Sequence, residues 1–325
     1  MTTKVLYFVK ADEAFYDMIR GQMPEDYELM TMSVGDEAEE TRLLASADAV
    51  IIGGYRLEGT HIAKAQRLRV ALHQGVGYHD TCDWKSLAMR GVPLSLTPEG
   101  TSEGVSEHTI MMMLAAGRRL AFVDAELRQG RWHSNTFRSS ARQLLGSTVG
   151  IIGLGRIGKQ LAHRLGTFGV ELLYTDLLEM GPDVERELNV TRVELDDLLS
   201  RSDFVTLHVP LTKLTHHMID ERALSLMASD AVLINCARGP VVKEAALVAA
   251  LKAGTIGAVG LDVFEVEPPV HPTPFAEFPN VVMTAHHAPG TRDTMEMKFK
   301  TIFENLRRFE AGDEMTNTVD YQAEP

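Results

Sequence analysis

Short apolar runs alternate with amphipathic, charge-bearing stretches along the first hundred residues. The runs are rich in branched side chains and have the length of buried strands: Val5–Val9, Ala49–Gly53, Arg69–Leu72 and Gly91–Leu94. The stretches between them, for example 36–47 and 60–67, have the pattern of surface helices. This alternation predicts βαβ units and a parallel sheet.

One long helix is predicted over Glu107–Leu127. Its centre, Ile110–Ala116, is apolar on every face, which is typical of a buried helix. A position in the protein core and a position in a subunit interface both fit this pattern.

The alternation of apolar runs and amphipathic stretches resumes at Ser147. It predicts further strands: Val149–Ile152, Val170–Thr175, Phe204–Val209, Ala231–Asn235, Ala258–Asp262 and Val281–Thr284. Helices are expected between them, and a last amphipathic helix over 294–310. We therefore predict an α/β protein with two doubly wound parallel sheets. Linkers near Gly100 and over 288–290 would insert the second domain, about 100–289, into the first, about 1–99 and 290–325.

Composition narrows the class of protein. Hydrophobic residues make up 45% and charged residues 24% of 325 positions, as in globular proteins. The net charge of −13 disfavours nucleic acid and anionic membranes as partners. Two cysteines far apart fit a reducing compartment. No signal peptide or membrane span is recognisable, so a cytoplasmic protein is expected.

A glycine-rich turn after the strand Val149–Ile152 is the most specific local motif. It has the pattern G-x-G-x-x-G between a strand and a helix, which permits a tight turn, a close approach of the backbone to a pyrophosphate and close helix packing. N–H groups at the start of that helix can bind the phosphates. The residues predicted to bind a dinucleotide here are Gly153, Gly155, Arg156, Ile157 and Gly158.

An acidic residue follows the next strand at the distance expected for a ribose contact. Asp176 stands 18 residues after Gly158 (176 − 158). A carboxylate there accepts hydrogen bonds from the ribose and repels a 2′-phosphate, and residues 177–180 contain no Arg or Lys. The predicted cofactor is therefore NAD rather than NADP.

Three later strands are each followed by a side chain suited to hydride transfer: Arg238, Glu267 and His286. Carboxyl ends of parallel strands meet at one edge of a sheet. An imidazole can act as acid or base near neutral pH, a carboxylate can orient it, and a guanidinium can bind an acid and polarise its carbonyl. Singly, they also fit a surface ion pair, a solvated loop acid and a core histidine. Together, they predict a catalytic site.

These motifs resemble those of the D-isomer-specific 2-hydroxyacid dehydrogenase family. The resemblance extends over nearly the whole chain and is densest from Leu68 to Thr291. Gly75-Val76-Gly77 resembles the family's substrate-carboxylate loop, and 208–212 with Thr215 is similar to the segment along the cofactor. The resemblance implies a Rossmann NAD-binding domain inserted in a flavodoxin-like substrate domain. It also implies a homodimeric enzyme that moves a hydride between NAD and a small D-2-hydroxy or 2-oxo acid.

Carried over residue by residue, the resemblance implies roles for the candidates. His286 would be the acid/base, Glu267 its partner, and Arg238 the group that binds the substrate carboxylate and carbonyl. Backbone N–H groups of Val76 and Gly77 would bind the same acid. The remaining expected cofactor contacts are Val209, Pro210, Thr215, Cys236, Ala237, Asp262 at the nicotinamide amide, and again Arg238 and His286.

The chain also departs from the family pattern. Ala285 stands where proline usually precedes the catalytic histidine, and a second histidine, His287, follows. Thr284 before and Thr291 after still indicate His286 as the acid/base. The run 78–83 replaces the common D-N-x-D, and Thr101 stands where the family often has Asn. These changes leave the identity of the acid open.

Two other functions remain open from the sequence. One is a non-catalytic, NAD-sensing scaffold like the corepressors built on this fold, against which the three candidate catalytic side chains argue. The other is a formate or phosphite dehydrogenase, which the simple N-terminus does not support. His216 and His217, with His208 nearby, suggest metal binding, but adjacent histidines are expected to point apart and no third ligand is suitably spaced. No metal is predicted.

Overall fold

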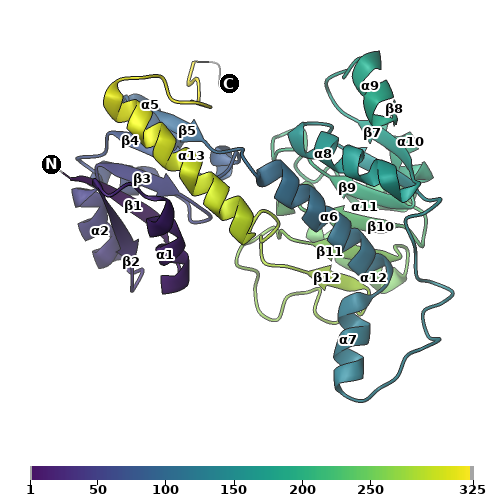
Figure 1. Cartoon of the computed structure of the whole chain (residues 1–325). Coiled ribbons are helices and arrows are strands. Elements are labelled where there is room, and N and C mark those ends of the chain that lie inside the picture. Colours follow the sequence, from purple (N-terminus) through teal and green to yellow (C-terminus); the bar gives the residue numbers. More distant parts are fainter. Residues whose placement is uncertain (1, 323–325) are drawn as a thin grey trace. The chain divides into compact units, whose positions relative to one another are not determined.

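The structure is a computed structural model, and it describes residues 2–322. The chain forms two compact units (Figure 1). The first unit comprises the residues up to Thr101 together with those from Thr291 onward, and the second comprises Ser102–Gly290.

A five-stranded parallel sheet forms the centre of the first unit, with strand order β2-β1-β3-β4-β5. This is the flavodoxin-like order. Its strands are β1 (Thr3–Lys10), β2 (Tyr27–Met32), β3 (Ala49–Ile52), β4 (Val70–His73) and β5 (Leu94–Leu96). Its helices are α1 (Glu13–Gln22), α2 (Glu37–Ser46), α3 (Gly59–Lys64), α4 (Tyr78–Thr81), α5 (Trp84–Met89) and α13 (Arg292–Ala311).

Both faces of this sheet are covered by helices. One apolar cluster joins the sheet to α2, α3 and α5, for example through Leu44, Ile62 and Leu87. The other joins it to α1 and α13 through Ile19 and Phe299. The first unit is therefore completed by a helix that follows the second unit in sequence.

A seven-stranded parallel sheet forms the second unit, with strand order β12-β11-β10-β9-β6-β7-β8. This is the Rossmann order with one further strand. Its strands are β6 (Thr148–Ile152), β7 (Glu171–Thr175), β8 (Val190–Arg192), β9 (Phe204–Leu207), β10 (Val232–Asn235), β11 (Ala258–Leu261) and β12 (Val281–Met283). Its helices are α6 (Thr101–Gly117), α7 (Leu120–Arg128), α8 (Arg156–Leu165), α9 (Pro182–Leu188), α10 (Leu195–Arg201), α11 (Glu221–Leu226) and α12 (Glu244–Ala253).

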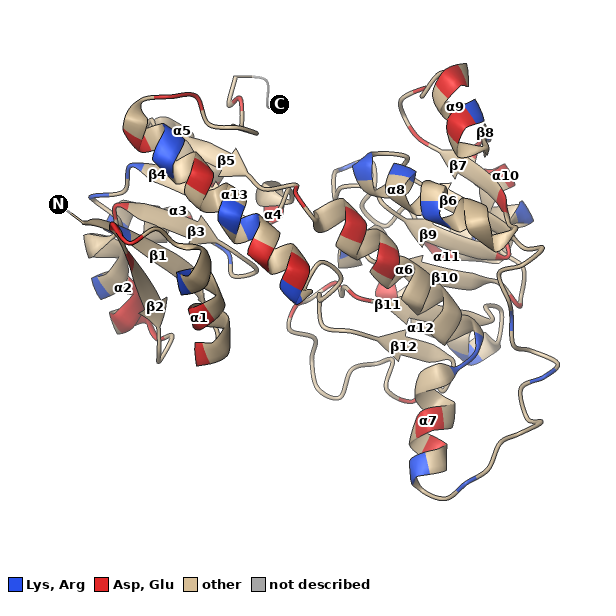
Figure 2. Ribbon diagram, in the orientation of Figure 1, with Lys and Arg blue, Asp and Glu red and all other residues tan. Residues whose placement is uncertain are grey.

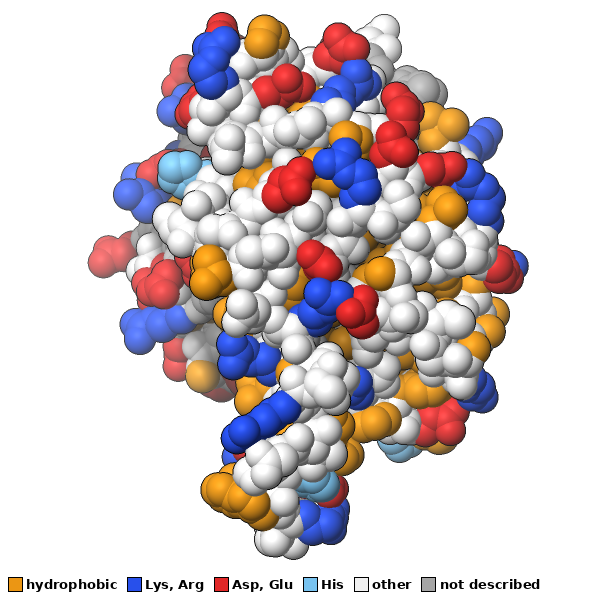
Figure 3. Space-filling model, turned by 90° about the vertical axis from the view of Figure 1, so that its right-hand side faces the viewer, with side chains coloured by type: hydrophobic (Ala, Val, Ile, Leu, Met, Phe, Trp, Pro, Cys, Tyr) orange, Lys and Arg blue, Asp and Glu red, His pale blue; other side chains and the backbone are white. Residues whose placement is uncertain are grey.

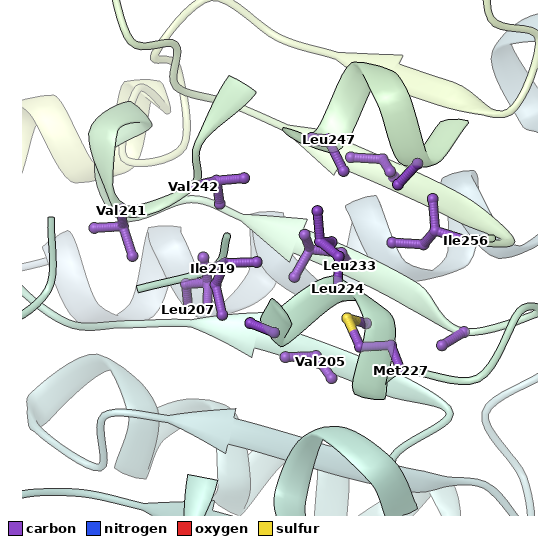
Figure 4. Packing of buried hydrophobic residues seen from close by; sticks show 14 of the residues in the cluster. Val205, Leu207, Ile219, Leu224, Met227, Leu233, Val241, Val242, Leu247 and Ile256 are labelled. Carbon is purple, nitrogen blue, oxygen red and sulfur yellow. The ribbon is translucent and has the colours of Figure 1, made fainter. Parts of the chain in front are cut away.

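Alternate residues of the central strands supply two apolar cores. Val205, Leu207 and Leu233 belong to the core shown in Figure 4. Val232 and Ile234 belong to the core on the opposite face. Each fully buried side chain of this kind stabilises the fold by about 1.5–3 kcal/mol. The sheet is thus a rigid base for the loops at its carboxyl edge.

The two doubly wound parallel sheets confirm the predicted fold class, and two details need correction. The predicted single helix Glu107–Leu127 is two helices, because Arg119 takes up a left-handed conformation (φ 54) and the N–H of Arg142 bonds to the carbonyl of Gly117. The strand predicted from Gly91 begins only at Leu94, since Gly91 is itself left-handed (φ 65) and Pro93 has no N–H. Within residues 2–322, no helix combines the length and apolar character needed to cross a membrane.

Candidate active site

The glycine turn connects β6 to α8 and has a shape that only glycine permits. Gly153 is left-handed (φ 96), and a side chain there would lie 2.6 Å from the carbonyl oxygen of His208. A Cβ on Gly158 would lie 2.2 Å from the oxygen of Gly153. Gly155 caps α8, and no described atom lies within 4 Å of its Cβ position, so the helix N-terminus is accessible to a phosphate. Figure 2 shows Lys and Arg along α8 as well. These features fit the pyrophosphate of a dinucleotide.

Asp176 follows β7 and is bonded to the glycine turn. Its Oδ2 accepts the N–H of Leu154 at 2.7 Å, and Oδ1 accepts that of Leu178 at 3.0 Å. A carboxylate has further acceptor capacity on both oxygens, so it can also accept ribose hydroxyls. Arg192 donates to the carbonyl of Asp176 at 3.2 Å and to Glu179 at 2.6 Å. Sequence reasoning missed this cation because it lies on β8, a strand that was not predicted.

The segment after β9 lies against the glycine turn. A side chain on Gly153 would also contact Val209, at 2.9 Å. Thr215 organises this segment, since its hydroxyl donates to the carbonyl of Pro210 at 2.6 Å and accepts the N–H of Thr212 at 2.8 Å. Burial lowers the pKa of His208 to about 3, which keeps that ring neutral. Of the predicted cofactor residues in this segment, Val209 is thus placed beside the turn.

His286 and Glu267 form a direct pair at the carboxyl edge of the sheet. Nδ1 of His286 lies 2.7 Å from Oε2 of Glu267, and Oε1 accepts the N–H of Phe264 at 3.0 Å. Burial alone would raise the pKa of Glu267, but the hydrogen bond and charge of His286, the Phe264 N–H and the charge of Arg238 hold it below its ordinary value. Glu267 therefore stays ionised and fixes the ring with Nε2 directed away from the pair.

Arg238 follows β10 in a turn that is held by a buried amide. Asn235 accepts the N–H of Ala237 at 3.0 Å and donates to the carbonyl of Arg238 at 2.9 Å. Gly239 is required next, because a Cβ there would lie 1.9 Å from the backbone of Phe264. This contact brings the Arg238 turn against the segment that leads to Glu267. Cys236 lies at the base of the turn, and burial raises the pKa of its thiol.

Asp262 holds the turn that carries His286. Its Oδ1 accepts the hydroxyl of Thr284 at 2.6 Å and the N–H of His287 at 2.8 Å, and its Oδ2 accepts the N–H of Ala288 at 2.9 Å. Nε2 of His108, on α6, lies 3.0 Å from the Thr284 hydroxyl. His286 itself is left-handed (φ 49), so the clamp fixes a backbone conformation that is otherwise rare. No local pattern in the sequence indicates this clamp, and the contact of Asp262 with a nicotinamide amide stays a prediction.

The remaining sequence predictions fall elsewhere. Val76 and Gly77 lie in the first unit, in the loop between β4 and α4.

The rings of His216 and His217 do not point apart as expected but stack, with centroids 3.9 Å apart. His217 is left-handed (φ 54), which turns its ring back toward His216, and Nε2 pairs with Glu265 at 2.8 Å. Within residues 2–322, no group of three or more His, Cys, Asp or Glu side chains could hold a metal ion.

Comparison with known proteins identifies the family. Residues 110–288, more than half of the chain, match the model of the D-isomer specific 2-hydroxyacid dehydrogenase, NAD binding domain. The chain belongs to the D-isomer-specific 2-hydroxyacid dehydrogenase family. The second unit of this dehydrogenase is accordingly its NAD-binding domain.

Individual relatives of this dehydrogenase agree with that assignment. It is 38% identical over 260 residues to glyoxylate reductase of Korarchaeum cryptofilum, covering 79% of this chain and 78% of the relative. It is 36% identical over 322 residues to glyoxylate reductase of Thermococcus onnurineus, covering 96% and 94%. The apo-structure of D-lactate dehydrogenase from Escherichia coli is similar with a TM-score of 0.86 at 25% identity, covering 98% of this chain and 100% of the other. The dehydrogenase is an NAD-dependent oxidoreductase of 2-hydroxy and 2-oxo acids, as its sequence predicts.

Proposed function

We propose that the enzyme reduces a small 2-oxo acid such as glyoxylate, with His286 as the proton donor. The observation that carries this proposal is the pair of His286 and Glu267 at 2.7 Å, next to the Arg238 turn. The two relatives described above are both named glyoxylate reductase. When bound, NADH supplies the hydride to the carbonyl carbon.

Each side chain then has one task during reduction. Nε2 of His286, in the charged form of the ring, donates a proton to the substrate's carbonyl oxygen. Glu267 stabilises that charged form and holds the ring in place. Arg238 binds the substrate carboxylate and polarises the carbonyl. In oxidation, the neutral ring takes the proton back from the hydroxyl.

In this proposal, the substrate carboxylate and the cofactor are bound by different residues. Backbone N–H groups of Val76 and Gly77 bind the carboxylate of the substrate. The glycine turn binds the pyrophosphate, and Asp176 accepts the ribose hydroxyls. Val209, Pro210, Thr215, Cys236 and Ala237 line the cofactor, and Asp262 contacts the nicotinamide amide.

A panel of substrates tests this function. Glyoxylate, hydroxypyruvate, pyruvate and phenylpyruvate are each mixed with NADH and enzyme, and the loss of nicotinamide absorbance is followed. We expect turnover of at least one acid and the highest kcat/KM with the smallest ones. NADH binding without turnover of any acid would favour a non-catalytic scaffold, and oxidation of formate or phosphite with NAD would favour that other activity.

We also propose that the enzyme is a homodimer formed through α6, α7 and the segment that follows them. Large apolar side chains of this region are exposed: Met111, Leu120, Leu127, Trp132 and Leu145. A groove of about 450 Å³ runs along α6 and is lined by Ile110, Met111, Leu114, Ala115 and Leu120, with Glu107 and Arg118. Figure 3 shows hydrophobic and basic side chains together on the projecting part that Figure 1 labels α7. A second copy would cover apolar area that the second unit itself leaves exposed.

A further inference from the structure

Two side chains of the first unit bind the backbone of the predicted substrate-carboxylate loop, residues 75–77. The N–H of Gly75 donates to Nδ1 of His73 at 2.9 Å. The hydroxyl of Thr81 donates to the carbonyl of Gly77 at 2.8 Å. Nε2 of His73 lies 2.7 Å from that same hydroxyl oxygen. The loop is therefore tied at its first and last residue to one connected pair of side chains.

The hydrogen bonds of this pair have a single direction. Because Nδ1 of His73 accepts an N–H, a neutral ring carries its proton on Nε2. Nε2 then donates a hydrogen bond to the hydroxyl oxygen of Thr81, and that hydroxyl donates to the carbonyl of Gly77. A ring without an acceptor at Nδ1 would place two donors, its own N–H and that of Gly75, against each other. His73 is 5% exposed, so water does not easily replace these bonds.

The backbone on both sides of the loop is held as well. The N–H of Gln74 bonds to the carbonyl of Ile52 at 2.9 Å, and the N–H of Thr97 bonds to the carbonyl of Gly75 at 3.1 Å. In contrast, the N–H groups of Val76 and Gly77 have no protein acceptor within residues 2–322. Val76 is 41% exposed. These two N–H groups therefore remain available to bind the substrate carboxylate, which is the role that the proposed function assigns to them.

We propose that His73, together with Thr81, is a positioning residue that holds residues 75–77 in the conformation that binds the substrate carboxylate. This inference rests on the proposed function, because it assigns a support to the donors of Val76 and Gly77. The support acts on substrate binding, whereas the acid/base pair and the glycine turn belong to the second unit. Its loss should raise KM for the acid and leave the chemical step and NADH binding unchanged.

Substitutions at both positions separate positioning from packing. His73→Leu removes both ring nitrogens, whereas His73→Asn keeps an acceptor close to the position of Nδ1. Thr81→Val removes the hydroxyl at nearly constant volume, and Thr81→Ser retains it. The probe is glyoxylate at saturating NADH, with kcat and KM measured separately. NADH affinity is measured by fluorescence titration, and folding is checked by thermal unfolding.

For His73→Leu and Thr81→Val we expect KM for glyoxylate to rise about tenfold, which corresponds to about 1.4 kcal/mol. We expect kcat and NADH affinity to stay close to wild type, and His73→Asn and Thr81→Ser to recover most of the loss. Unchanged KM in a folded Thr81→Val variant, or an equal fall of kcat in all four variants, would overturn the inference. If the wild type reduces no 2-oxo acid at all, the proposed function fails and the inference fails with it.

Discussion

The ring of His286 is held by a side-chain bond between its Nδ1 and Oε2 of Glu267 at 2.7 Å. The ring is 40% exposed and the carboxylate 35% exposed, so both are accessible to a ligand while they remain paired. The backbone is fixed separately, because the carbonyl of Asp262 accepts the N–H of His286 and its side chain accepts that of His287. Asp262 therefore holds the backbone turn that carries His286, and Glu267 holds its imidazole ring.

Removing the ring should abolish most of the activity. For His286→Ala we expect kcat/KM to fall by about 10²–10⁴, the usual value of a positioned acid/base, while NADH still binds. Glu267→Gln should lower kcat by less, since the ring keeps a polar neighbour but loses the charge that stabilises the imidazolium. Steady-state kinetics and NADH titration check both. His287→Ala is the matched control, and near-normal turnover of His286→Ala would remove that residue from the mechanism.

At the scale of elements, the sequence predicted the strands that lie within the sheets better than those at their edges. Interior parallel strands are contiguous apolar runs, because both of their faces are buried. β2 lies at an edge and interrupts its apolar residues with Glu28 and Thr31, and β8 is three residues long with two of them exposed. Neither has a recognisable pattern.

The side chains that support the site could not be predicted for a related reason. Arg238, Glu267 and His286 follow strands whose order the sequence indicates. Asp262 instead acts on the N–H groups of His287 and Ala288, which come close to it only after the sheet has formed. His108 is 176 residues from the hydroxyl it contacts. Local pattern carries no information about such a distance.

The last helix, α13, contains a buried ammonium group with a testable effect on stability. Lys298 is 2% exposed, and burial lowers its pKa to about 8, although the charge of Glu99 opposes this. Below pH 8 the lysine is charged in the folded and the unfolded chain, so the cost of burial is fully present. Between pH 8 and the unfolded value the unfolded chain binds more protons, so stability should rise with pH.

Lys298→Met should therefore stabilise the protein, and the gain should depend on pH. The pKa shift from 10.5 to about 8 corresponds to at most about 3 kcal/mol near pH 7, less whatever the pairing with Glu99 contributes. The gain should shrink toward pH 10. Urea unfolding of both proteins at pH 7 and pH 10 measures it, with Lys300→Met, at an exposed position of the same helix, as control. A difference independent of pH would contradict this account.

At the scale of the molecule, the proposed dimer predicts the effect of a charge on α7. Leu120→Glu places a carboxylate in the groove along α6, where a second copy would have to bury it. We expect this variant to sediment as a monomer at concentrations where the wild type is a dimer. Met89→Glu, at an apolar and exposed position of α5 in the first unit, should leave the assembly unchanged. A dimeric Leu120→Glu protein would place the interface elsewhere.

The position of α13 in the sequence affects how the chain can fold during its synthesis. Its apolar residues, Phe299, Ile302 and Phe303 among them, cover the sheet face that includes Val5 and Ile51. The ribosome makes all of the second unit before it makes this helix. Until then, a nascent first unit exposes the part of this apolar face that α1 does not cover. A chain that stops at Gly290 would keep that part uncovered and should aggregate.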